Sequence, residues 1–305
     1  MGIVDGKKLR ENYVFRNFYN GFRLIKQEKI ALICLIYLLV LVATAVIGPS
    51  ITSYEYDRNL VTEDGSILRG ESPSLAHPFG TNDVGQDVFS RVIHGARATV
   101  ITGAVGGFLI MTVGTLMGVV SGYVGGRTDD VLMRFTDIVY GVPVIPIALV
   151  LFALFELGFF GSIVMIGLIL WRGAARVIRS QTLQIRERPF VLSAKATGAS
   201  TPRIIVKHIL PNVAPMAVLY LALGVGWSII IQAGLAFIGV TDPFVPSWGI
   251  IVRNAYKSGQ MASLWWWSLP PGILISLTVV STFMIGRSLE QNLQDQGGQA
   301  IMAEE

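Results

Sequence analysis

The sequence predicts an all-α polytopic membrane protein with six transmembrane helices. Of its 305 residues, 52% are hydrophobic and only 14% are charged, whereas a soluble domain carries about 25% charged residues. Mean hydropathy is +0.59. Apolar runs long enough to cross a bilayer core of about 30 Å recur along the chain, and they lack the alternation that strands of a β-barrel require. This composition excludes a disordered chain, a coiled coil and an ordinary cytosolic enzyme.

The first apolar run covers residues 30–47 and lacks a small-residue cleavage site. We therefore expect a retained membrane anchor rather than a signal peptide. The later runs cover residues 100–120, 138–155, 160–171, 213–240 and 264–285. The expected organisation is a cytoplasmic segment at 1–29, the first helix at 30–47, an extracytoplasmic segment at 48–97, a five-helix core at 98–286 and a cytoplasmic tail at 287–305.

The distribution of Lys and Arg predicts the orientation, because cytoplasmic loops of membrane proteins are enriched in both. The first 29 residues and the loop 172–212 are strongly basic, whereas segment 48–97 has four basic and seven acidic residues. Both termini and loop 172–212 should therefore be cytoplasmic. The net charge is +4, but no dense basic tract is present, so binding to nucleic acid is not expected.

The expected extracytoplasmic segment 48–97 (the outer segment) ends with residues 87–97, which have an apolar helical face. This pattern predicts a short amphipathic helix leading into the second span, with Asp87 and Arg91 spaced for an ion pair. The helix either lies at the membrane interface or packs on its own bundle.

Glycines at 114, 118 and 122 follow one face of the second span and predict a close helix contact. The pair at 125–126 should end that helix, and Thr128 is a candidate cap for the next one. A Walker-type phosphate loop is absent from the sequence, so ATP binding by that route is not expected.

The basic loop 172–212 predicts two short helices. Pro189 suits the first turn of one helix, and Gly198 can close it in a left-handed cap. Thr201 can cap a second helix, which should end near Pro211. Small residues in the first helix permit close contact with a docking partner; the alternative is a purely structural linker.

Other residues give no sign of catalysis or of a bound cofactor. Cys34 is the only cysteine, which excludes a disulfide framework within one chain. His77, His94 and His208 are far apart in sequence and predict no metal site. The acid Glu156 falls at a glycine turn that should be solvated.

The basic loop also resembles a known signature. Residues 190–200 read F-V-L-S-A-K-A-T-G-A-S, and residues 209–212 read I-L-P-N. This stretch resembles the E-A-A…G…I-x-L-P signature of permease subunits of type I ABC importers, with Leu192 where the family usually has glutamate.

Further positions are similar to the second permease of dipeptide and oligopeptide systems (the peptide/nickel transport family). They are Gly80, Asp87, Arg91, Gly95, Arg97, Gly126, Asp130, Arg134, Asp137, Pro211, Trp248 and Gly249. Their order along most of the chain makes the resemblance specific. Residues 286–289 read G-R-S-L, where the family usually has G-D-x-L.

The resemblance implies the type I ABC importer permease fold, in the cell membrane, without enzymatic activity or cofactor of its own. A homologous permease would complete the path, two ATP-binding cassette ATPases would dock on the cytoplasmic helix, and an extracytoplasmic binding protein would deliver peptide. The implied ATPase-coupling residues are Phe190, Leu192, Ser193, Ala194, Lys195, Ala196, Gly198 and Ala199.

Two other classes remain as alternatives. A secondary transporter of small solutes would show inverted repeats and interrupted helices. An intramembrane enzyme would carry a polar catalytic set within its spans, which here are almost free of ionisable residues. The transported molecule itself stays open among dipeptides, longer peptides, nickel chelates and sugars.

Overall fold

A computed structural model describes residues 28–302 of the chain, and the side chains up to residue 291. Its elements are helices, with two isolated β-bridges among the described residues. In chain order they are α2 (Lys29–Ile51), α3 (Val88–Val124), α4 (Gly126–Gly141), α5 (Val144–Phe155), α6 (Phe159–Leu170), α7 (Arg172–Arg186), α8 (Pro189–Ala196), α9 (Thr201–Ile204), η1 (Ile205–Ile209), α10 (Leu210–Ile238), α11 (Trp248–Lys257) and α12 (Trp265–Met302). The basic residues between positions 7 and 26 lie outside the described part.

Four described helical segments are long and apolar enough to cross a membrane alone: α2, α3, residues 201–238 and residues 265–291. The bent pairs α4–α5 and α6–α7 raise the number to six if each pair is one span. The prediction of a multi-pass all-α protein is therefore confirmed.

The predicted third span, residues 138–155, is wrong as a single helix. It is divided between α4 and α5, which meet at an angle of 89°. Pro143 causes the break, because its ring excludes a helical hydrogen bond and clashes with the preceding turn. Val142 is accordingly extended, with φ −91° and ψ 126°.

The predicted amphipathic helix at 87–97 is not separate from the second span. Both belong to α3, a single helix of 37 residues. The first turn of its polar side is buried, since Asp87 and Ser90 are each 1% exposed and Arg91 is 8% exposed. The outer segment folds over them, so this helix packs within its own chain.

The glycine row of α3 packs against α7. Ideal Cβ atoms at Gly114 and Gly118 would lie 2.5 Å from the Ala174 Cβ and 2.6 Å from the Ala175 carbonyl oxygen. A Cβ at Gly122 would lie 2.8 Å from the Thr182 Cβ. The contact is between backbones, and the predicted close helix approach is confirmed.

The second helix of the basic loop does not end near Pro211. The chain passes from α9 through the π-turn η1 directly into α10, and the Leu210 N–H donates to the Ile205 carbonyl. The wider turn accommodates Pro211, because in a regular helix the proline ring would clash with the carbonyl group four residues earlier. Ser200, rather than Thr201, is the N-cap position.

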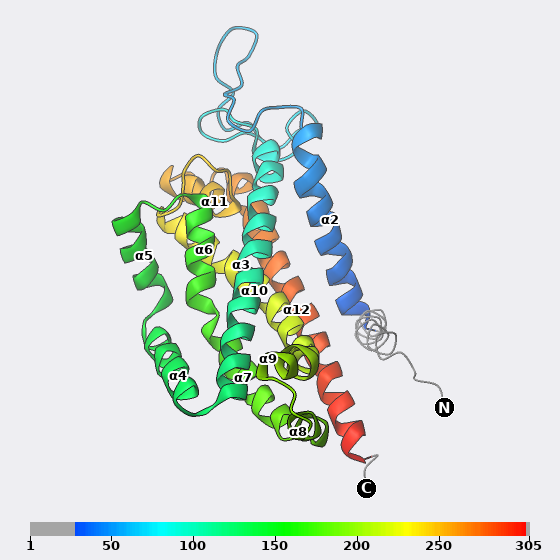
Figure 1. Cartoon of the computed structure of the whole chain (residues 1–305). Coiled ribbons are helices and arrows are strands. Elements are labelled where there is room, and N and C mark those ends of the chain that lie inside the picture. Colours follow the sequence, from blue (N-terminus) through cyan, green and yellow to red (C-terminus); the bar gives the residue numbers. More distant parts are fainter. Residues whose placement is uncertain (1–27, 303–305) are drawn as a thin grey trace.

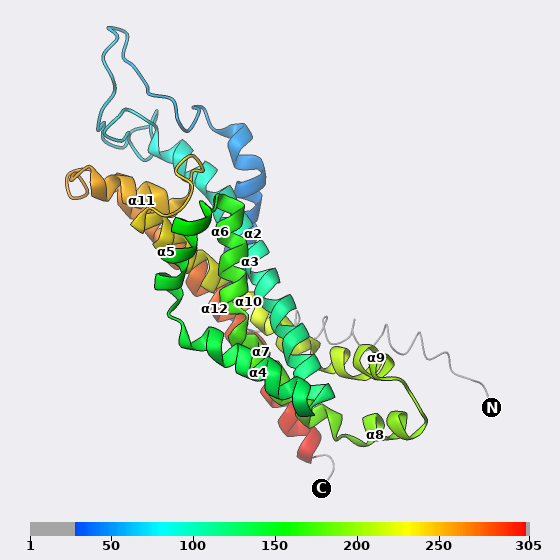
Figure 2. The same ribbon diagram turned by 60° about the vertical axis from the view of Figure 1, so that its left-hand side comes forward.

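The two ends of the bundle differ (Figure 1). The outer segment and α11 lie at one end, and α4, α7, α8 and the end of α12 lie at the other. Figure 2 shows α8 and α9 projecting from the side of the bundle at that second end. This arrangement gives the chain two separate surfaces on which partners can act.

We predict that Gly118→Ala destabilises the chain by about 1–3 kcal/mol, because the added methyl group would overlap the α7 backbone. Gly173→Ala is the matched control, since a Cβ there meets nothing within 4 Å and alanine favours helix. Thermal unfolding in detergent measures both. A Gly118→Ala midpoint at or above that of Gly173→Ala would contradict the packing.

Candidate functional site

Helix α8 is a short helix with one buried side chain. Val191 is 1% exposed and packs in a cluster with Ile204, Ile209 and other apolar residues of α3, α7 and α10. Phe190 and Leu192 are 40% and 48% exposed. The other exposed residues of α8 are Pro189, Ser193, Lys195 and Ala196. The helix therefore keeps most of its surface free for a partner while its anchor fixes its position.

The end of α8 has the geometry that the sequence predicted. Gly198 has φ +81°, and its N–H donates to the Lys195 carbonyl. The Ala199 N–H donates to the Ala194 carbonyl at 3.1 Å. These two bonds form a Schellman motif, which needs a left-handed residue at the glycine position. Nothing lies within 4 Å of a Cβ built on Gly198, so the requirement for glycine there is one of backbone conformation.

The connection behind α8 is also fixed. The ring of Phe190 lies 6.1 Å from that of His208 on η1, centroid to centroid. Ala194 and Ala199 are partly buried against the same cluster as Val191. The loop 189–209 is thus a folded unit that can transmit a displacement into α10.

A charged clamp joins α4 to α7 next to this unit. The guanidinium of Arg179 donates to both carboxylate oxygens of Asp129, at 2.6 Å and 2.5 Å. Ser121, at the end of α3, also donates to Asp129. This pairing was not predicted, since Asp129 and Arg179 are 50 residues apart and spacing alone cannot join them. The expected Thr128 cap is absent: Gly125 is the N-cap of α4 and no side chain caps it.

The other end of α4 is held by α7 as well. The guanidinium groups of Arg172 and Arg176 lie 4.6 Å and 4.0 Å from the ring centroid of Tyr140. Arg176 also pairs with Asp137 at 2.6 Å on an exposed surface. Because α4 is fixed to α7 at both ends, these two helices and the start of α8 form one block.

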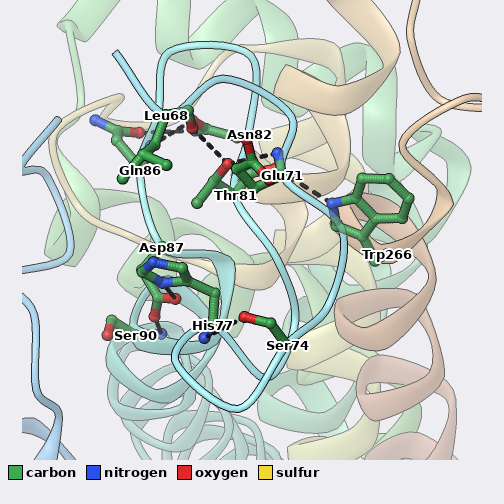
Figure 3. Close-up of polar contacts among 10 residues, drawn as sticks. All are labelled: Leu68, Glu71, Ser74, His77, Thr81, Asn82, Gln86, Asp87, Ser90 and Trp266. Atoms are coloured by element: carbon green, nitrogen blue, oxygen red, sulfur yellow. Dashed lines mark hydrogen bonds and ion pairs between the residues drawn. The ribbon is translucent and has the colours of Figure 1, made fainter. Parts of the chain in front are cut away.

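At the opposite end, the outer segment is tied to the start of α3 (Figure 3). Asp87 accepts from the Ser90 N–H at 2.7 Å and contacts His77 Nδ1 at 3.0 Å. The expected ion pair of Asp87 with Arg91 does not form. Arg91 instead donates to the Tyr56 carbonyl at 3.1 Å and to Gln86.

A tryptophan of α12 closes the same region. The Trp266 N–H donates to the Thr81 carbonyl at 3.2 Å, and the Thr81 hydroxyl donates to the Leu68 carbonyl at 2.6 Å. Gly80 has φ +59°, and a Cβ there would overlap Trp266 and the Glu71 carbonyl. In the exposed turn nearby, hydrogen bonding from the Thr62 hydroxyl lowers the pKa of the Asp64 carboxyl.

The remaining family-motif positions divide into packed and exposed residues. Gly95 lies under Trp248, whose N–H donates to the Val92 carbonyl at 2.9 Å. Gly249 packs on the Ala233 carbonyl of α10. Arg97, Asp130 and Arg134 are exposed. Gly126 has φ +56° at the turn into α4, and Pro211 is in the first turn of α10.

Metal chemistry has no evident place in the described residues, where no group of three or more His, Cys, Asp or Glu side chains could hold an ion. The three histidines lie on the outer segment, on α3 and on η1.

Comparison with known proteins shows which family this chain resembles. Residues 114–295 match the family described as "Binding-protein-dependent transport system inner membrane component", and residues 20–71 match the "N-terminal TM domain of oligopeptide transport permease C". The chain is 34% identical to the dipeptide transport system permease protein DppC of Bacillus subtilis, over 90% of this chain and 84% of that protein. It is 31% identical to the oligopeptide transport system permease protein OppC of Haemophilus influenzae, over 95% and 89% of the two chains.

We predict that Asp87→Ala loosens the outer segment, because α3 loses its cap and His77 loses its partner. Loss of an N-cap alone costs about 0.5–2 kcal/mol. Proteolysis of residues 52–86 and thermal unfolding measure the effect. Glu63→Ala is the control, since it removes a carboxylate from an exposed position of the same segment; identical digestion of the two variants would argue against the tie.

A double-mutant cycle on Asp129 and Arg179 should give a coupling free energy of about 1–2 kcal/mol, because two charge-assisted bonds join partly buried groups. The pair Asp137 and Arg176 is the matched control and should couple by less than about 1 kcal/mol, since both side chains are exposed. Unfolding of each single and double alanine variant supplies the values. Equal couplings would show that the clamp is an ordinary surface pair.

Proposed function

The chain belongs to the family of binding-protein-dependent transport system inner membrane components, and from that premise we propose that it is the permease subunit of an ATP-driven importer of peptides. The peptide assignment is supported by the printed names of its relatives, which are dipeptide and oligopeptide permeases. Family membership disfavours the alternative of a secondary transporter.

The coupling surface is the exposed side of α8. The observation that carries this proposal is the contrast between the buried Val191 and the exposed Phe190 and Leu192 on one eight-residue helix. A partner ATPase that holds the exposed side would move Val191 and, through it, η1 and α10. The docked residues are Phe190, Leu192, Ser193, Lys195 and Ala196, and the turn at Gly198 and Ala199 sets the shape of the lever.

Leu192 gives this surface a particular chemistry. Where the family signature has glutamate, this chain presents an apolar side chain that is 48% exposed. The partner surface facing Leu192 should therefore be apolar rather than cationic.

Family membership supports the assembly that we propose. A homologous permease completes the path, two ATPase subunits bind the α8 end, and a binding protein delivers peptide at the end that carries the outer segment. The chain itself is not catalytic. ATP binding would draw the two ATPases together, and α8 would transmit that movement to the bundle.

We predict that both termini and α8 are cytoplasmic. Single cysteines introduced at Ser53 and Ser200, in a Cys34→Ser background, should react with an impermeant thiol reagent from opposite sides of the membrane. Reaction from the same side would reject the topology. The charge asymmetry between the outer segment and loop 172–212 supports the expected result.

We predict that Gly198→Val uncouples ATP hydrolysis from uptake in the reconstituted transporter. Valine at φ +81° is strained although no atom blocks its side chain, so the end of α8 must change shape. Ala196→Trp should also weaken ATPase docking, by obstructing the exposed side. Complex recovery, ATPase rate and peptide uptake measure the effects.

Lys195→Ala should lower uptake less than these two variants, because an exposed ion pair contributes only about 0–1 kcal/mol. If Gly198→Val and Ala196→Trp assemble and transport like the parent, α8 is not the coupling element.

A further inference from the structure

Helix α4 carries a stripe of exposed apolar side chains. Val131, Phe135 and Ile138 are 65%, 50% and 69% exposed, and Val142 follows at the C-cap position of the helix. Successive members of this set, the α4 stripe, are four, three and four residues apart, which is the spacing of the a and d positions of a coiled coil. The side chains therefore line one face, and the spacing is suited to packing against another helix.

The opposite face of α4 is fixed to its own chain. Thr136 is fully buried, and Asp129 is held by the guanidinium of Arg179. The ring of Phe135 stacks at 6.1 Å, centroid to centroid, on the ring of Trp171, which is buried. Helix α4 is thus held with its stripe pointing outward.

Charged side chains follow one edge of the α4 stripe. Arg127, Asp130, Arg134 and Asp137 are all exposed, and their charges alternate in sign along the helix. Carboxylates are costly in the hydrocarbon of a bilayer, so this edge is not suited to lipid tails. Two acids balance two bases, which gives the edge no net attraction to anionic headgroups. An apolar stripe with a balanced charged edge is instead suited to a protein surface.

The position of α4 indicates which subunit covers it. Helix α4 lies on the opposite side of the bundle from α8 and α9 (Figures 1 and 2). In the proposed assembly the ATPases bind the α8 end, and the binding protein acts at the end with the outer segment. The subunit that remains to lie beside the bundle is the homologous permease.

The alternating charges are complementary to a second copy of the same helix. Helix α4 is turned by 89° from α5, so it runs across the direction in which α5 crosses the membrane. A two-fold axis normal to the membrane then makes two such helices antiparallel. Asp130 of one helix would face the position equivalent to Arg134 on the other, and the reverse pair would form as well, as a two-fold contact requires.

We propose that the α4 stripe packs against the equivalent helix of the homologous permease, with the Asp130 and Arg134 positions paired at its edge. This inference rests on the proposed function, because that function requires a second permease. Since α4 is clamped to α7, the contact joins this block to its counterpart in the other permease, and movement of one block is passed to the other.

The test uses the whole transporter in proteoliposomes, with the homologous permease, the ATPases and the binding protein. The photoreactive residue p-benzoylphenylalanine replaces Phe135 or, in a second variant, Ile138, and mass spectrometry locates the adducts. Both positions should form adducts with the equivalent helix of the homologous permease. The same probe at Leu75, which is exposed on the outer segment, is the control and should form none with that helix.

Charge reversal tests the paired edge. Arg134→Glu should lower the adduct yield at Phe135 about two- to threefold at low salt, because an attractive exposed pair becomes repulsive. The loss should shrink at high salt, where the charges are screened. Arg69→Glu makes the same change at an exposed position of the outer segment and should leave the yield unchanged.

The outcomes separate this contact from the proposed function. Adducts of the stripe with lipid, with an ATPase or with another part of the homologous permease would overturn the proposal, as would the absence of any adduct. An unchanged yield in Arg134→Glu would overturn the pairing at the edge. A chain that assembles with no homologous permease would overturn the proposed function itself.

Discussion

The backbone contact between α3 and α7 is the constraint on which the rest of this structure depends. It requires glycine at 114, 118 and 122, because any side chain there would hold the two helices apart. Close approach brings Arg179 to the Asp129 carboxylate and puts Arg172 and Arg176 over Tyr140. It also fixes where α7 ends, and therefore where α8 begins.

Breaks in helical hydrogen bonding shape the remainder. Pro143 separates α4 from α5 and leaves α4 along α7 instead of continuing across the membrane. Gly198 ends α8 in a left-handed turn, and the π-turn before Pro211 lets the chain enter α10 without stopping. Each break meets a local requirement of the backbone. Together they leave α8 as a short separate helix that is anchored by the buried Val191.

Local patterns were predictable from the sequence, and long-range pairings were not. The apolar runs predicted a multi-pass helical bundle, and the α8 cap followed from Pro189 and Gly198, because these residues act on their own backbone. The Asp129–Arg179 clamp, the His77–Asp87 contact and the burial of Arg91 depend on which helices meet, which residue spacing does not encode. The single third span failed for a related reason, since hydropathy is insensitive to a bend at Pro143.

The unbroken helix α3 connects the two ends of the molecule. At about 1.5 Å per residue, its 37 residues span about 55 Å, more than the bilayer core of about 30 Å. Asp87 ties its first turn to the outer segment, and Ser121 near its last turn reaches the α4–α7 clamp. A displacement of the α8 block must therefore either move α3 as a rigid body or separate its glycine contacts. Because those contacts are between backbones, separating them should cost more free energy than moving α3 as a rigid body. A displacement of α8 should therefore also move the end of α3 that carries the outer segment.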